Sequence, residues 1–159
     1  MNQFGELADL ARAFPELTIV CDHTGGVVGL GPYASRREEA FAEWKRGMKE
    51  LACCLNVSMK LGGLAMPLSG FGWQDRDLPP TSLEMAEATA PYYLECIKAF
   101  GPERCMFESN FPVEKVSCSY RVLWNSFKRI AKAFSPDEKA ALFHDTAART
   151  YRIGTAQHA

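Results

Sequence analysis

Four polar side chains stand within or just after short apolar segments, and their types can take part in catalysis or binding. They are His23, Lys60, Glu108 and Asn110. An imidazole can accept a proton or contact a substrate, an ammonium can stabilise a developing oxyanion, and an amide can hold water by hydrogen bonds. A carboxylate among them is a further candidate for the general base. Whether these groups can act together depends on the elements that position them.

Each of these residues also has a structural interpretation. His23 could be a turn residue that bonds to nearby backbone in the stretch DHTGG. Lys60 and Glu108 could form an ion pair inside the fold, and Asn110 could cap a turn. The residues by themselves leave both interpretations open.

Short apolar segments alternate with helical patterns along the chain. Strands are expected at 17–21, 56–63 and 104–112. The predicted order is helix, strand, helix, strand, helix, strand, helix, helix, which implies right-handed crossovers and a parallel sheet. Three parallel strands are few for such a sheet, and a complete (β/α)8 barrel takes about 250 residues. The expected fold is therefore α/β, a partial barrel.

Start and stop signals place the helices. Leu7, Leu10 and Phe14 repeat at helical spacing before Pro15 ends the first helix. Capping boxes with a helix after each are expected at Ser35 with Glu38, at Thr81 with Glu84, and at Ser135 with Glu138.

Two further helix starts follow from residue type. Pro91 is expected in the first turn of a separate helix that ends at Gly101, because proline suits a first turn better than an interior. Asp145 is expected to cap a last helical turn through Tyr151, followed by a frayed tail at 154–159.

The alternation of side chains along a strand predicts which residues face the helices. Val57, Met59 and Leu61 share one face, and Lys60 lies on the other. The same reasoning turns Glu108 and Asn110 toward the inside of a barrel, while His23 has the parity of Ile19 and Cys21. His23, Lys60 and Asn110 fall at or near the carboxyl ends of strands, where active sites of parallel α/β proteins gather.

Composition narrows the function classes. The chain has 159 residues, 47% of them hydrophobic, and a formal charge of −1 from mixed acidic and basic residues. This balance gives no electrostatic footprint for nucleic acid or for an anionic membrane. No apolar run approaches the roughly 18 residues of a membrane span, and the first residues lack a signal-peptide pattern. We expect one domain, a cytoplasmic location, and six reduced, mainly buried cysteines.

Five stretches resemble a known family in order and spacing. They are FPELTIVCDHTGG, Trp44, NVSMKLGGL, FGPERCMFESNFPVEK and ALFHDTAARTYRI. Together they resemble the C-terminal half of amidohydrolase-related family 2, the metal-dependent hydrolases of TIM-barrel fold. The likeness spans roughly residues 7–153. It implies that residues 1–153 form the C-terminal portion of such a barrel, with about strands six to eight and their helices.

The resemblance also implies roles. His23 matches the strand-six histidine, which in the family coordinates metal or contacts the substrate. Asn110 stands where many relatives have an aspartate that activates the attacking water, and an amide has no comparable basicity. Lys60, Glu108 and Trp73 are expected to contact the substrate, with the loop of Trp73 covering the pocket. Glu108 is the nearest replacement for the general base.

The family's His-x-His pair and its strand-five histidine have no counterpart in this sequence. The other histidines are His144, in a predicted helical region, and His158, in the tail. Zinc sites usually need at least three protein ligands. A divalent metal such as zinc is therefore expected in a full-length enzyme, with His23 as one ligand, and not in this chain alone.

Three functions remain open. The first is hydrolysis of a lactone, cyclic ester or related small carbonyl compound by water attack. The second is the decarboxylase branch of the same superfamily. The third is a noncatalytic partial barrel, whose open strand edges call for self-association or for an N-terminal barrel half.

Overall fold

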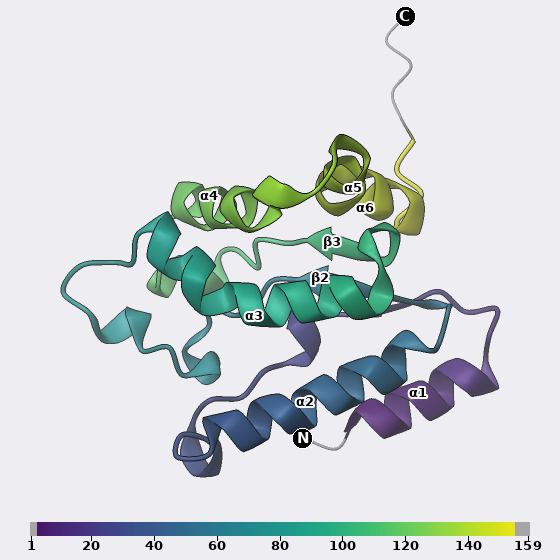
Figure 1. Ribbon diagram of the computed structural model, residues 1–159, viewed down its shortest axis with the longest axis horizontal. Coiled ribbons are helices and arrows are strands. Elements are labelled where there is room, and N and C mark those ends of the chain that lie inside the picture. Colours follow the sequence, from purple (N-terminus) through teal and green to yellow (C-terminus); the bar gives the residue numbers. More distant parts are fainter. Residues whose placement is uncertain (1–2, 155–159) are drawn as a thin grey trace, which may run out of the picture.

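The structure is a computed structural model that describes residues 3–154 (Figure 1). All of the expected tail at 154–159 except Gly154 lies outside these residues. The strands are β1 (Ile19–Cys21), β2 (Val57–Leu61) and β3 (Cys105–Phe107). The helices are α1 (Gln3–Ala13), α2 (Arg37–Ala52), α3 (Ser82–Phe100), α4 (Tyr120–Ile130), α5 (Pro136–Ala140) and α6 (Thr146–Thr150), with short 3-10 turns between several of these elements.

The three strands form one parallel sheet in the order β1-β2-β3. Val57 pairs with Ile19, and Met59 pairs with Cys21 on one side and with Cys105 on the other. The helices follow one another around the sheet, since α1 packs on α2, α2 on α3, and α3 on α4 (Figure 1). The predicted parallel α/β arrangement is confirmed, and its strands are shorter than the sequence pattern suggested.

Strand β2 shows the predicted alternation. The side chains of Val57, Met59 and Leu61 are fully buried, whereas Ser58 and Lys60 are partly exposed. The buried face meets the helices through a core of large side chains that includes Trp44, Met48, Tyr93, Phe100 and Phe127. The face of Val57, Met59 and Leu61 is thus covered, and the other carries Ser58 and Lys60 together with the buried Met106.

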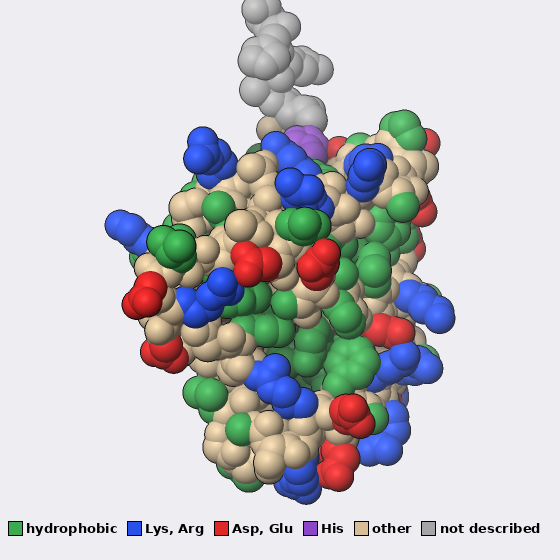
Figure 2. All heavy atoms as spheres, turned by 60° about the vertical axis from the view of Figure 1, so that its left-hand side comes forward, with side chains coloured by type: hydrophobic (Ala, Val, Ile, Leu, Met, Phe, Trp, Pro, Cys, Tyr) green, Lys and Arg blue, Asp and Glu red, His purple; other side chains and the backbone are tan. Residues whose placement is uncertain are grey.

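Strands β1 and β3 are the edges of this sheet within residues 3–154. Large hydrophobic side chains also remain on the surface, such as Leu55 at 82% and Leu78 at 76% exposure. In Figure 2 hydrophobic side chains form a continuous hollow strip between charged groups. Unpaired edges and exposed apolar surface together indicate that this unit has surface suited to further protein contacts.

Two predicted capping boxes are confirmed and one is wrong. Thr81 accepts a hydrogen bond from the backbone of Glu84, whose carboxylate accepts one from the backbone of Thr81, and the box at Ser135 forms in the same way. The box predicted at Ser35 does not form, because α2 begins two residues later and Arg36 precedes it without a side-chain cap. Glu38 and Glu39 instead lie in the first turn, where their charges favour the helix dipole.

The predicted helix start at Pro91 is wrong, because α3 runs unbroken from Ser82 to Phe100. Proline removes one backbone hydrogen bond from a helix interior. Buried residues on both sides of Pro91, among them Met85, Tyr93 and Ile97, pack into the core and outweigh that loss.

The predicted cap at Asp145 is also wrong. Asp145 has helical backbone angles and no capping hydrogen bond. It ends a five-residue π-helical turn, Ala141–Asp145, that joins α5 to α6 without a break.

Two further sequence expectations concern thiols and membranes. All six cysteines are free; five are buried as predicted, and Cys53 is exposed. Within residues 3–154, none of the helices is both long and apolar enough to cross a membrane.

Candidate active site

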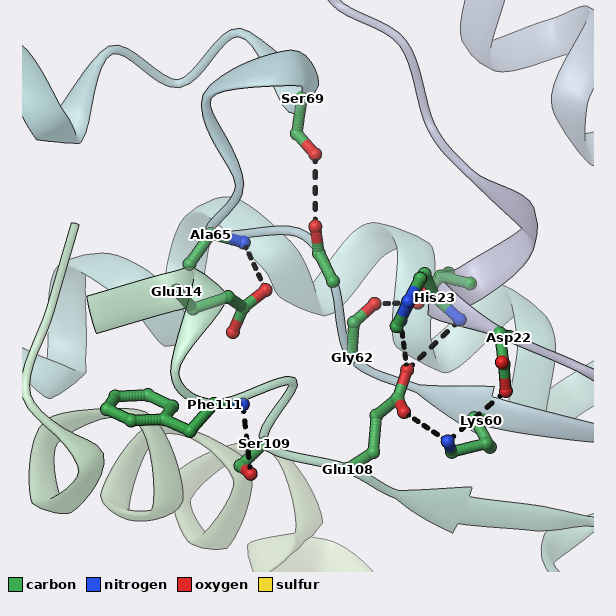
Figure 3. A network of polar contacts seen from close by, with 12 residues as sticks. Asp22, His23, Lys60, Gly62, Ala65, Ser69, Glu108, Ser109, Phe111 and Glu114 are labelled. Atoms are coloured by element: carbon green, nitrogen blue, oxygen red, sulfur yellow. Dashed lines mark hydrogen bonds and ion pairs between the residues drawn. The ribbon is translucent and has the colours of Figure 1, made fainter. Parts of the chain in front are cut away.

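Charged side chains from all three strands converge at the carboxyl ends of the sheet (Figure 3). Asp22 and His23 follow β1, Lys60 lies near the end of β2, and Glu108 follows β3. Because the strands are parallel, their ends meet at one edge, and the side chains come within hydrogen-bonding distance of one another. We refer to these four residues as the strand-end network.

Glu108 contacts both the ring and the backbone of His23. His23 Nδ1 lies 2.6 Å from Glu108 Oε1, and the His23 backbone N–H donates to the same oxygen at 3.0 Å. A carboxylate only accepts hydrogen bonds, so it assigns the ring proton to Nδ1 and leaves the lone pair on Nε2. The histidine is therefore oriented as a base or a ligand.

The turn after β1 directs the imidazole into the network. Strand alternation alone would put His23 on the helix-covered face of Cys21. The strand ends at Cys21, however, and the next residues turn through left-handed backbone angles, with φ of 53° at His23 and 54° at Thr24. Thr24 Oγ1 donates to the Gly62 carbonyl at 2.8 Å, and Trp44 Nε1 donates to the Thr24 carbonyl at 2.9 Å. These bonds fix the turn.

The paired glycines after β2 give the network room. A Cβ atom on Gly62 would collide with the side chain and carbonyl of Glu108, and one on Gly63 would collide with Cβ of His23. Gly63 also has a φ of 80°, which favours glycine. The two glycines let residues from the neighbouring strands approach β2 from both sides.

Lys60 joins the two acidic residues of the network. Its Nζ lies 2.6 Å from Glu108 Oε2 and 3.2 Å from Asp22 Oδ1. Burial lowers the pKa of Lys60, but the hydrogen bonds and charges of Glu108 and Asp22 outweigh burial and raise that pKa above its ordinary range. Lys60 is therefore an ammonium at neutral pH, and its charge is balanced by two carboxylates.

Among residues 3–154, Asn110 and Trp73 have no hydrogen bond or ion pair with the strand-end network. Asn110 sits in the turn after β3 with a φ of 49°, and its Nδ2 is buried without a hydrogen-bond partner among residues 3–154. Trp73 is 7% exposed and stacks on Phe71, with ring centroids 4.6 Å apart. The structure thus joins His23, Lys60 and Glu108, and within residues 3–154 it shows no hydrogen bond from the side chain of Asn110 or Trp73 to those three.

Sequence reasoning missed Asp22 and Glu114. Asp22 could have been found, because Val20 pairs with Ser58 and alternation then puts Asp22 on the face of Lys60. Glu114 is fully buried and accepts a hydrogen bond from the Ala65 backbone at 2.9 Å. It lies in an irregular turn, where periodicity gives no signal.

The described residues do not supply a metal site. Within residues 3–154, no group of three or more His, Cys, Asp or Glu side chains is arranged to hold a metal ion. His144 pairs with Asp145 at 2.7 Å on the surface, and Glu108 is occupied by His23 and Lys60. A metal at His23 would need ligands from outside the described residues.

A groove of about 730 Å³ runs between α1 and the free edge of β1. Its apolar lining includes Phe4, Leu7 and Leu10 from α1, and Cys21 and Val28 from β1 and the following loop. The groove adjoins the network, because Asp22 is also part of its lining.

Comparison with known proteins finds similar sequences within longer chains. A model of the amidohydrolase family matches residues 2–153. The protein y4mH of Sinorhizobium fredii is 42% identical over 151 residues, which are 95% of this chain and 44% of that protein. An L-fucono-1,5-lactonase of Burkholderia multivorans is 34% identical over 136 residues, which are 85% of this chain and 43% of the lactonase.

Solved structures also match this chain, and they too are longer amidohydrolases. Two crystal structures of an amidohydrolase from Burkholderia multivorans, one with bound HEPES and one with bound zinc, match with TM-scores of 0.81 and 0.77. Each is 27% identical, and each match covers 96% of this chain and 50% of the other. The chain thus spans about half the length of these relatives and corresponds to part of an amidohydrolase barrel. With the family model matched over nearly every residue, the chain belongs to the amidohydrolase family.

Proposed function

We propose that this chain carries part of the active site of a lactone hydrolase, in which His23 activates water. The observation that supports the proposal most directly is the 2.6 Å contact between His23 Nδ1 and Glu108 Oε1. It orients the ring, fixes the tautomer and leaves Nε2 to act on water or substrate. The side chain of His23 is 35% exposed, so the ring remains accessible.

The reaction follows from this tautomer. His23 Nε2 takes a proton from water as the water oxygen attacks the lactone carbonyl carbon. The ring C–O bond then breaks, and the imidazolium returns the proton to the leaving oxygen, which gives a hydroxy acid. Glu108 stabilises the imidazolium while the proton resides on Nε2, because its carboxylate already faces Nδ1.

The remaining residues have supporting roles in the proposal. Lys60 contacts Glu108 and supplies positive charge at the strand ends, although two carboxylates already balance that charge. Asn110 positions water or substrate from the neighbouring turn. Trp73, on the loop between β2 and α3, contributes apolar surface to a pocket bordered by Arg76 and Lys115.

The substrate class comes from the named relatives. The chain is similar to an L-fucono-1,5-lactonase and, at 23% identity, to an L-rhamnono-gamma-lactonase. Both names specify sugar lactones, so we propose a sugar lactone as the substrate. Zinc is present in one structure of a related amidohydrolase. If such a metal were bound at the strand ends, His23 Nε2 would be the ligand from this chain, and its single lone pair would then not be free to take the proton from water.

We further propose that the active form includes the half of the barrel that this chain does not contain. The relatives are about twice as long. The free edge of β1 and the apolar groove beside it offer that half a strand partner and a surface to bury. The same two features favour the second candidate function, a noncatalytic partial barrel that only assembles with a partner.

Hydrolysis of L-fucono-1,5-lactone tests these proposals. The assay compares this chain alone with this chain mixed with the remaining part of y4mH, which the sequence match leaves uncovered. We expect turnover in the mixture, with a decrease of at least about 100-fold for His23→Asn. His144→Asn is the control, because that histidine is 68% exposed and lies outside the network.

The outcomes separate the alternatives. Full activity of His23→Asn would refute the role of His23. Binding between the two parts without turnover of any lactone would favour the noncatalytic barrel. Release of carbon dioxide from a carboxylated substrate, in place of hydroxy-acid formation from a lactone, would indicate the decarboxylase branch.

A further inference from the structure

A buried carboxylate lies beside the strand-end network and is not part of it. The side chain of Glu114 is fully buried. Its Oε1 accepts a hydrogen bond from the backbone of Ala65 at 2.9 Å, which ties the turn after β3 to the loop after β2 (Figure 3). Its Oε2 has no hydrogen-bond partner among the described residues. An unpartnered carboxylate oxygen in the interior is costly and calls for an explanation.

Asn110, four residues before Glu114, has a buried hydrogen-bond donor without a partner within residues 3–154, which complements the unpaired acceptor of Glu114. Its Nδ2, a donor, is buried and also lacks a partner among the described residues. The two residues are joined through the backbone, since the N–H of Glu114 donates to the Asn110 carbonyl at 3.3 Å. The Asn110 side chain is near enough to Glu114 to influence its ionisation. An unpaired donor and an unpaired acceptor, both buried atoms, therefore belong to two side chains that are close enough to interact.

We infer that Glu114 is the positioning residue for Asn110, holding the Asn110 Nδ2 group with Oε2. An amide has its donor and its acceptor on opposite branches. Nδ2 carries two hydrogens, but it is buried, so with one of them held by Glu114 the atom left to meet water or substrate is Oδ1. Asn110 then acts in the site as a hydrogen-bond acceptor. This role rests on the proposed function, whereas the contact with Glu114 does not.

The electrostatic surroundings agree with this arrangement. Burial raises the pKa of Glu114 to about 7, the backbone of Ala65 opposes that rise, the charge of Glu108 adds to it, and Asn110 opposes it. The other titratable groups near Glu114 are Tyr93 and Cys118. Burial raises the pKa of Tyr93 well above its ordinary value and that of Cys118 to about 12, so both stay protonated near neutral pH.

The side-chain amide of Asn110 reports directly on this contact. Its NMR resonances are assigned by their loss in Asn110→Asp and followed from about pH 5 to about pH 9 in the unmodified chain. We expect both amide protons to shift with a midpoint near the pKa of Glu114, about 7. The shift should vanish in Glu114→Gln and persist in Glu16→Gln, which removes an exposed carboxylate. It should also persist in His23→Asn, which removes the nearest imidazole.

Three results would overturn the inference. They are an Asn110 amide that does not respond to pH in the unmodified chain, one that titrates unchanged in Glu114→Gln, and one that stops titrating in His23→Asn. If Glu114→Gln does not give a folded spectrum, Glu114→Asp replaces it: the carboxylate is drawn back by one methylene, so the amide shift must change. No substrate or turnover enters these measurements. Their failure is therefore distinct from a failure of the lactone hydrolysis assay.

Discussion

Replacing Glu108 with glutamine tests how strongly the strand-end network stabilises the fold. The Glu108 side chain is 10% exposed and contacts Lys60 Nζ and His23 Nδ1 at 2.6 Å each. Glutamine nearly preserves its shape and removes its charge. Lys60 then keeps only Asp22, at 3.2 Å, whose side chain is 55% exposed.

The magnitude follows from these contacts. Removing one partner of a buried ion pair costs about 3–5 kcal/mol, and a charged hydrogen bond contributes about 1.5–3 kcal/mol. Lys60 is 23% exposed and retains one carboxylate, so the lower values apply. We expect Glu108→Gln to lower the free energy of unfolding by about 2 kcal/mol.

The matched control is Glu95→Gln. Glu95 contacts Lys45 Nζ at the same distance of 2.6 Å, but the side chains are 22% and 35% exposed and form a single pair near the surface. Its loss should cost no more than about 1 kcal/mol. Urea denaturation at neutral pH, where Lys60 is charged, measures both variants. A decrease for Glu108→Gln no larger than that for Glu95→Gln would refute the idea that the network is a stabilising, desolvated unit.

Three further changes probe the surrounding structure. Burial raises the pKa of folded Glu114 to about 7 from an ordinary 4.5, so its contribution to stability is complete at about pH 4 and decreases by about 3 kcal/mol as the pH rises through about 7. Urea titrations should show that decrease in the unmodified chain and not in Glu114→Gln. Gly63→Ala should lower the free energy of unfolding by about 2 kcal/mol or more, because φ is 80° and the new Cβ collides with His23. Thermal denaturation compares this variant with Gly5→Ala. Gly5 lies in α1 with open space around it, so that substitution should be neutral or stabilising. Pro91→Ala restores a backbone donor inside α3 and should raise stability by about 1 kcal/mol in the same measurement, and a loss of stability would show that proline is required there.

Strand periodicity predicted the part of the site that lies on or next to strands. The alternation in β2 predicted that Lys60 lies on the other face of the strand from Val57 and Met59. The alternation in the segment 104–112 predicted that Glu108 points toward the inside of a barrel. These two assignments were enough to predict the Lys60 and Glu108 ion pair as one of two interpretations. The structure shows that pair at 2.6 Å.

The part of the site that the sequence could not predict depends on turn geometry. His23 lies beyond the end of β1, where strand parity no longer applies, and its left-handed backbone angle turns the ring toward Glu108. Asn110 is likewise in a left-handed conformation after β3, and its environment includes a buried glutamate four residues later. Such conformations depend on contacts between loops distant in sequence, which no local pattern records.

The helix predictions failed for a similar reason at Pro91 and Ser35. Both rested on the local preference of one residue type. Pro91 is tolerated inside α3 because buried side chains on either side of it pack against the sheet and α4. The helix preference of one residue changes the free energy of folding by about 3 kcal/mol or less, and the free energy gained by burying several large side chains is larger.

The sharing of one carboxylate explains why a lysine and a histidine occur together at the strand ends. Glu108 Oε2 contacts Lys60 and Oε1 contacts His23, so each oxygen has its own partner. Lys60 Nζ donates to one carboxylate oxygen of Glu108, which leaves the other as the acceptor for the ring. This acceptor holds the ring proton on Nδ1 and keeps Nε2 available. The ion pair that the sequence offered as a structural alternative therefore shares its carboxylate with the contact that orients His23 for its proposed role.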